Sequence, residues 1–179
     1  MPALDQPVGN LRVGEAERAG SPPGSAPEER VLIVLNPGDP VGTVRSVLRE
    51  VDPSNVGCHL LLVYPTAEYE ARRRGRIETG VNAPYTIDHL ADEARQTAAR
   101  VGKDWIDGIG ADFEAMGYVG RTRDAVLGAA RRYHYDRIYV PRSNPSIWSR
   151  ILSSDPLPDE LGRALPAVVK IISVSVTSF

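Results

Sequence analysis

The stretch R-I-Y-V-P-R-S-N-P-S-I-W-S-R-I-L-S-S-D, residues 137–155, decides the fold class. Its opening run, Ile138 to Val140, is short and apolar, as expected for a strand buried on both faces of a sheet. A turn follows at Pro141, and the remainder has the spacing of a phosphate-binding loop without its glycines. A buried strand that leads into such a loop is typical of nucleotide-binding α/β proteins.

The rest of the chain alternates strand and helix patterns. Apolar runs predict strands over residues 31–35, 59–64, 113–119, 138–140 and 168–176. Helical spacing of apolar residues predicts helices after Pro40, over residues 87–105, from Thr122 and over residues 159–165. We therefore predict an α/β fold with a five-stranded parallel sheet, doubly wound and Rossmann-like. Ligands of such sheets bind beyond the carboxyl ends of the strands.

Two segments fall outside this pattern. Residues 1–29 include a run rich in glycine, serine and proline, so we predict a flexible tail before a domain that spans residues 30–179. Residues 65–84 are rich in arginine and glutamate and show no apolar stripe, so we predict a long mobile connection there.

Composition excludes several classes of partner. The formal net charge is −2, which gives no field to attract nucleic acid or an anionic membrane. Cys58 is the single cysteine, so no internal disulfide forms. The chain shows neither an apolar run of membrane-spanning length nor a basic N-terminal region followed by an apolar one, and we expect a cytoplasmic protein.

The element order and several local patterns resemble the universal stress protein family. The resemblance covers residues 30–176 and is carried by the run from Gly120 to Leu127, by Tyr135-Asp136 before the fourth strand, and by the loop spacing G-x-x-G-nine residues-G-[S/T]. It implies a five-stranded parallel α/β domain that forms a homodimer through its last strand, from Val168 to Val176.

The resemblance also implies where a nucleotide would bind. In ATP-binding members an aspartate ends the first strand and contacts the ribose, and Asn36 stands there in this chain. Asparagine can bond a hydroxyl group but lacks the charge that strengthens the bond. The adenine of those members lies against the end of the second strand, which matches Val63 and its neighbours.

The phosphate loop departs from the family pattern at all four of its marked positions. Pro141, Asn144 and Ser154 replace the three glycines, and Asp155 replaces the hydroxyl residue. Glycines let backbone N–H groups close around phosphate oxygens, whereas proline has no N–H to donate. A carboxylate at ~4 Å repels each phosphate charge by about 1 kcal/mol in bulk water. We therefore expect no tight ATP binding and no cofactor.

Asp155 has a structural interpretation as well. It precedes a predicted short helix, and an acid at a helix N-terminus complements the helix dipole. Our hypothesis is that Asp155 occupies the site that phosphate fills in relatives. Arg142 and Arg150 offer an alternative, because either guanidinium could restore anion binding.

No catalytic or metal-binding motif accompanies this fold. The chain has neither a G-x-S-x-G elbow nor a phosphate-binding P-loop, and its three histidines fall on separate elements. We predict a non-catalytic regulatory or binding module that forms a homodimer and has a possible protein partner. Two alternatives stay open: an ATP-binding universal stress protein with slow or no hydrolysis, and an α/β domain whose small ligand lies under the 65–84 connection.

Overall fold

The computed structural model describes residues 12–14, 29–81, 83–109, 111–142 and 156–175. One mixed sheet forms the centre, with the strand order β1-β4-β3-β2-β5-β6. The strands are β1 (Arg12–Gly14), β2 (Glu29–Leu35), β3 (Val56–Tyr64), β4 (Phe113–Val119), β5 (Arg137–Pro141) and β6 (Lys170–Val174). The strands β2 to β6 run parallel, which confirms the predicted five-stranded parallel sheet.

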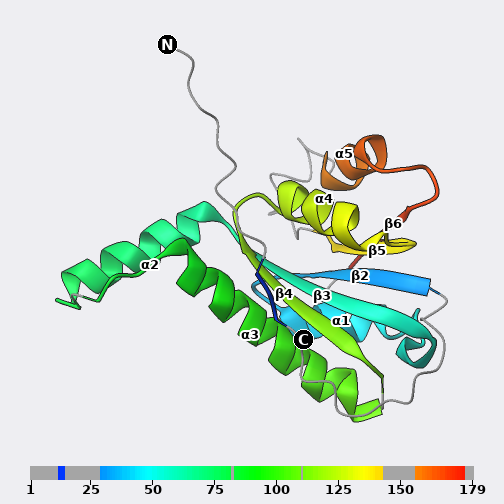
Figure 1. The fold of residues 1–179 in the computed structure, drawn as a ribbon, viewed down its shortest axis with the longest axis horizontal. Helices are drawn as coiled ribbons and strands as arrows, with labels where there is room; N and C mark the ends of the chain where they lie inside the picture. The colour runs from blue at the N-terminus through cyan, green and yellow to red at the C-terminus, as the bar shows by residue number, and fades with distance from the viewer. Residues whose placement is uncertain (1–11, 15–28, 82, 110, 143–155, 176–179) are drawn as a thin grey trace.

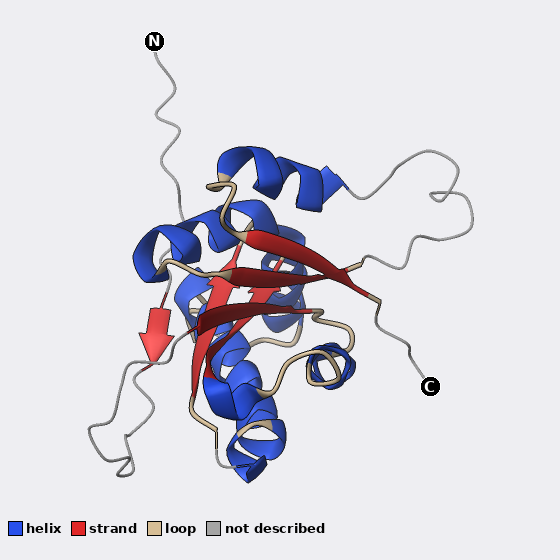
Figure 2. Ribbon diagram, turned by 90° about the vertical axis from the view of Figure 1, so that its right-hand side faces the viewer, coloured by secondary structure: helices blue, strands red, loops and turns tan. Residues whose placement is uncertain are grey.

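Helices cover both faces of this sheet (Figures 1 and 2). They are α1 (Pro40–Val47), α2 (Thr66–Glu78), α3 (Ile87–Trp105), α4 (Thr122–Tyr133) and α5 (Pro156–Ala164). The helices α1 and α3 pack on one face and α4 and α5 on the other. None of the described helices combines the length and apolar composition needed to cross a membrane.

The continuous apolar run of β2 explains its central place. Val31, Ile33 and Leu35 point into the core under α1 and α3, while Leu32 and Val34 point into the core under α4. All five side chains are buried. A strand with helices on both faces needs apolar residues at consecutive positions, as the sequence predicted.

Local capping fixes where the helices begin. The Asp39 carboxylate accepts a hydrogen bond of 2.8 Å from the Gly42 N–H and so caps α1. Thr86 caps α3 and forms a reciprocal pair with His89. Thr122 could cap α4 by its residue type, but Arg121 is the cap residue and Thr122 is the first helical residue.

The predicted mobile connection at residues 65–84 is wrong over most of its length. Residues Thr66–Glu78 form α2, a helix with no buried side chain. Its glutamates and arginines are good helix formers, and Glu68 pairs with Arg72 one turn later. A prediction that relies on an apolar stripe cannot find a helix that buries none of its side chains.

The tail prediction also needs a correction. Within residues 1–29, Arg12–Gly14 form β1, which pairs antiparallel with the outer edge of β4. Glu29 already belongs to β2. The other residues of the predicted tail lie outside the described part of the chain. Further along, α5 begins at Pro156 rather than at residue 159, and the described last strand is Lys170–Val174.

Candidate functional site

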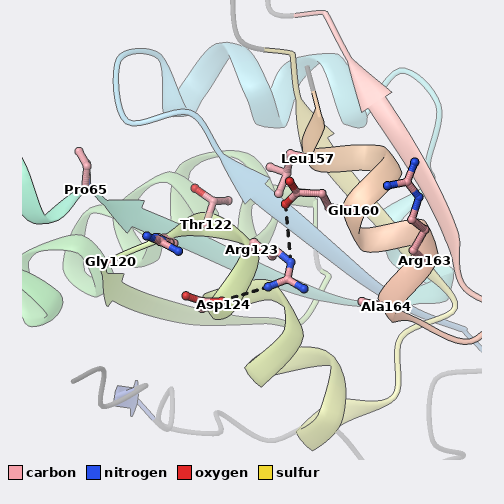
Figure 3. A pocket seen from close by; sticks show the side chains of 10 residues that line it. Pro65, Gly120, Thr122, Arg123, Asp124, Leu157, Glu160, Arg163 and Ala164 are labelled. Carbon is pink, nitrogen blue, oxygen red and sulfur yellow. Dashed lines mark ion pairs between the residues drawn. The ribbon is translucent and has the colours of Figure 1, made fainter. Parts of the chain in front are cut away.

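An open pocket of about 970 Å³ lies where β3 and β4 end (Figure 3). Its walls come from three places: the residues that follow the two strands, the first turn of α4, and one side of α5. The described lining residues are Pro65, Gly120, Arg121, Thr122, Arg123, Asp124, Leu157, Glu160, Arg163 and Ala164. The position agrees with the rule that parallel sheets bind ligands at the carboxyl ends of their strands.

Gly120 sets the geometry of this edge. Its backbone has a φ of +147°, which side chains resist, and an added Cβ would lie 2.8 Å from the Tyr118 ring. In this conformation the Gly120 N–H donates a 2.9 Å hydrogen bond to the carbonyl of Tyr64. The bond ties the end of β4 to the end of β3, so the residues that follow Gly120 start α4 beside the pocket.

Arginines give the pocket its charge. Arg123 forms ion pairs with Asp124 at 3.8 Å and with Glu160 of α5 at 3.6 Å, which links the two helices across the pocket (Figure 3). No ion pair with Arg121 or Arg163 is found within the residues that the structure describes. The two acids of the described lining, Asp124 and Glu160, both pair with Arg123. The charge left over comes from Arg121 and Arg163, which favours an anionic ligand over a cationic one.

Asn36, the position predicted to face a ribose, follows β2 directly. Its side-chain oxygen accepts a 2.9 Å hydrogen bond from the Gly38 N–H, and its own N–H donates to the Thr43 hydroxyl at 3.1 Å. The Asn36 carbonyl accepts from the Asp39 N–H at 3.1 Å. These bonds use the asparagine to build the turn between β2 and α1.

The other predicted residues that are described lie on the same sheet edge. Leu35 is in register with Leu62, which places Asn36 beside Val63. Val63 is 4% exposed and its side chain belongs to the core, so only its backbone could contact a ligand. Arg142 follows β5, with an exposed side chain and an N–H that donates to the Val174 carbonyl at 2.8 Å. None of these three residues lines the described pocket.

The remaining predicted positions cannot be placed. Asn144, Ser154 and Asp155, together with Arg150, lie outside the described residues. The interpretation of Asp155 as an internal anion therefore stays a prediction.

Comparison with known proteins rests on structure alone. No family model matches the chain, and no curated protein matches it. The hypothetical protein MJ0577, a test case for assigning biochemical function from structure, matches with a TM-score of 0.57 and 13% identity, over 86% of this chain and 100% of that one. The chain has the universal stress protein fold.

Two further solved structures are similar at lower scores. A universal stress protein in complex with cAMP matches with a TM-score of 0.45 and 19% identity, over 85% of this chain and 100% of that one. The hypothetical protein PH0823 matches with a TM-score of 0.45 and 14% identity, over 84% of this chain and 98% of that one.

The structure adds residues that the sequence reading missed on this universal stress protein fold. Arg121, Arg123, Glu160 and Arg163 line the pocket, and none of them was predicted. One signal was available, because Arg121 and Arg123 directly follow the glycine that ends a predicted strand. Glu160 and Arg163 carried no such signal, since only the packing of α5 beside α4 brings them to the pocket.

The titratable side chains of the described pocket lining are arginines and two acids, Asp124 and Glu160. The described lining holds neither histidine nor cysteine. Burial raises the pKa of nearby Tyr118, and Asp124 adds to the rise, so that phenol stays protonated near neutral pH. In the part of the chain that is described, no three histidine, cysteine or acidic side chains lie close enough together to hold a metal ion.

Proposed function

We propose that the protein is a non-catalytic, cytoplasmic binding module of the universal stress protein type, which regulates through what it binds and does not bind ATP tightly. The observation that carries the proposal is the turn at Asn36. The side-chain oxygen at the ribose position already accepts the Gly38 N–H, so a ribose hydroxyl would compete with a bond inside the protein.

The start of the phosphate loop supports the same proposal. Pro141 ends β5 and has no N–H, and the N–H of Arg142 is taken by the carbonyl of Val174. Pro141 and Arg142 therefore offer no backbone donor to a phosphate. Universal stress proteins that bind ATP are expected to use backbone donors in this loop.

The pocket supports a second candidate function, the binding of a small anionic molecule other than ATP. Arg121 and Arg163 supply the charge, and Thr122 supplies a hydroxyl group at the start of α4. This candidate replaces the earlier alternative of a ligand under a mobile 65–84 connection, because that segment is the helix α2.

Calorimetric titration with Mg-ATP, ADP and AMP tests the proposal. We expect no saturable heat with any of the three at millimolar nucleotide. Micromolar affinity for Mg-ATP would contradict the proposal and support the ATP-binding alternative. A parallel titration of the Asn36→Asp variant tests the observation at Asn36 on which the proposal rests. A carboxylate can accept hydrogen bonds from the Gly38 N–H and from a ribose hydroxyl at the same time. A gain in ATP affinity is expected only if the rest of the site is intact.

A thermal unfolding screen with small anions tests the second candidate. A ligand present at 100 times its Kd adds about 2.7 kcal/mol to the free energy of unfolding. Arg163→Met should abolish the shift, whereas Arg132→Met on the far part of α4 is the matched control and should keep it. If both variants keep the shift, the ligand binds elsewhere.

We also propose that the chain forms a homodimer through β6. This strand lies at one end of the sheet, so one side of its backbone has no partner strand among the described residues. Just before it, Val168 is 74% exposed. An open edge beside an exposed apolar side chain is a surface that a second copy can cover.

Sedimentation tests the homodimer. At micromolar concentration we expect about twice the chain mass of 19.5 kDa. Val168→Lys should shift the protein toward the monomer, while Ile109→Lys, at a site that is 57% exposed on another part of the surface, should not. A wild-type monomer would contradict the proposal.

A further inference from the structure

The helix α2 is attached to the body in an unusual way. It has 13 residues and none of them is buried, whereas the next helix, α3, buries six of its residues in the core. Pro65 precedes α2 and gives it no side-chain cap. Figure 1 shows α2 extending beyond the sheet, with the link to α3 running back along it. Apolar burial therefore contributes little to holding this helix, because Tyr69 is its one residue that packs against a described core cluster.

Contacts between arginine and tyrosine hold it instead. The Arg72 guanidinium lies over the ring of Tyr64 at 5.1 Å, and that of Arg76 lies over the ring of Tyr85 at 5.0 Å. The Tyr69 ring stacks on Tyr85 at 6.0 Å, and the Tyr69 hydroxyl donates to the Tyr85 carbonyl at 3.2 Å. Each contact joins α2 to a residue outside it, so together they form a seam along one side of the helix.

Ion pairs complete the seam. Arg72 pairs with Glu68 at 2.7 Å within α2 and with Glu93 of α3. The Tyr85 hydroxyl also donates to Glu93, at 3.2 Å. The side chains of Arg72, Glu68 and Glu93 are 35%, 40% and 47% exposed, so water and salt weaken these pairs.

The closed position also carries a cost. The Nε of Arg76 is buried and has no hydrogen-bond partner among the described residues. A buried donor without a partner is unfavourable, and opening the seam would return it to water. Beneath α2 lies a small apolar cluster formed by Leu90, Ala91 and Val119. Tyr69 of α2 packs against that cluster, and so do Tyr64, Tyr85 and Ile87 from outside the helix.

We propose that α2 is a hinged lid, closed by the arginine–tyrosine seam, that opens as a unit and uncovers the side of the apolar cluster on which Tyr69 packs. Pro65 is the hinge at one end, and Gly80, with a φ of +72°, is the hinge at the other. Opening breaks only half-exposed contacts and leaves the main cores intact, so it needs far less free energy than global unfolding. Pro65 also lines the pocket, so this hinge lies beside it.

Hydrogen exchange on the full chain tests the lid without any ligand. The amides of α2 should exchange as a group, at least about tenfold faster than those in the buried part of α3. Arg72→Met keeps an unbranched, largely apolar stem and removes the guanidinium group, and it should speed exchange in α2 by about three- to tenfold while α4 is unchanged. Arg73→Met is the matched control on the exposed face of α2 and should have no effect.

A salt series gives a second readout. At about 1 M salt the screening length is about 3 Å, so exchange in α2 should rise while exchange in α3 stays constant. The lid is wrong if α2 exchanges no faster than α3 in the wild type. It is also wrong if the Arg72 and Arg73 variants behave alike, or if Arg72→Met speeds exchange in every helix equally.

Discussion

The polar side chains at the two ends of the parallel strands differ in whether they have partners. At the amino edge, where the parallel strands begin, charged and polar groups bond to one another. Arg137 pairs with Glu29, and the N–H of Arg30 donates to the Asp136 carboxylate at 2.8 Å. At the carboxyl edge, Arg121 and Arg163 face a pocket with no acidic partner in the described structure.

A cluster of four side chains shows how complete the pairing at the amino edge is. A 2.7 Å hydrogen bond joins His59 Nδ1 to the Tyr135 hydroxyl, and the Tyr133 hydroxyl donates to Glu114 at 2.7 Å. His59 Nε2 lies 3.7 Å from Glu114. The rings of Tyr133 and Tyr135 meet the His59 ring edge-on, with centroids at 4.6 and 5.3 Å.

The comparison separates structural polar groups from candidate functional ones. Burying a polar group costs free energy unless a partner satisfies it, so a closed set of partners stabilises the fold and leaves nothing for a ligand. Polar groups that face a pocket without a partner are the ones a ligand can use. Histidine and tyrosine, which often mark active sites, are structural in this cluster.

Loss of the Tyr135 hydroxyl should give the largest effect. Tyr135→Phe leaves His59 without its buried partner and should lower the free energy of unfolding by about 1–3 kcal/mol. Tyr118→Phe is the matched control at the carboxyl edge, where no hydrogen bond to the hydroxyl is found within the described residues, and should cost less than about 0.5 kcal/mol. Urea denaturation measures both. Equal losses would remove the distinction between the edges.

A pH dependence should follow from His59. Burial lowers the pKa of its imidazole below the usual 6.5, although Glu114 acts against the shift and Arg30 adds to it. The folded protein then binds fewer protons than the unfolded chain, so the free energy of unfolding falls as the pH drops through 6.5 toward the folded pKa. Urea midpoints at about pH 7.5 and about pH 5.5 measure this fall.

The variant His59→Gln serves as the control for that pH effect. It should flatten stability across this range, because the carboxyl groups with lowered pKa values among the described residues, Glu29 and Asp52, have ordinary values of 4.5 and 3.8 and titrate at lower pH. A variant that keeps the full pH dependence would show that another group causes it.

The smallest expected effect is the difference in the free energy of unfolding between single arginine variants at the two ends of the strands. Arg137→Met removes a half-exposed ion pair with Glu29 and should cost up to about 1 kcal/mol. Arg163→Met should change the free energy of unfolding by less than about 0.5 kcal/mol, since its side chain is exposed. Thermal unfolding of both variants in low salt measures the difference. A larger loss for Arg163→Met would assign that arginine a structural role.

Sequence predicted the elements that bury an apolar face. The strand Phe113–Val119 and the helix Ile87–Trp105 have the predicted bounds, because alternation and helical spacing record which side chains enter the core. The helix α2 left no such record, since it is held by arginine–tyrosine contacts. The strand β1 shows no such pattern in the sequence either, because its three residues join the sheet by backbone pairing with β4.

The sequence predicted where the candidate site lies better than it predicted which residues form it. The strand ends near Asn36 and Val63 do form the carboxyl edge, as the order of elements required. The charged lining depends on α5 packing beside α4, which brings Glu160 within reach of Arg123. Contacts between residues so distant in sequence leave no local pattern to read.

The short strand β1 bears on how many copies can assemble. A sheet with two bare ends can add a neighbour at each end and grow without limit, as fibrils do. Arg12–Gly14 cover the outer side of β4, so the described sheet ends in this three-residue strand on one side and in the five-residue strand β6 on the other. A strand this short offers few backbone groups to a second chain, so β1 shortens the edge on which another copy could pair.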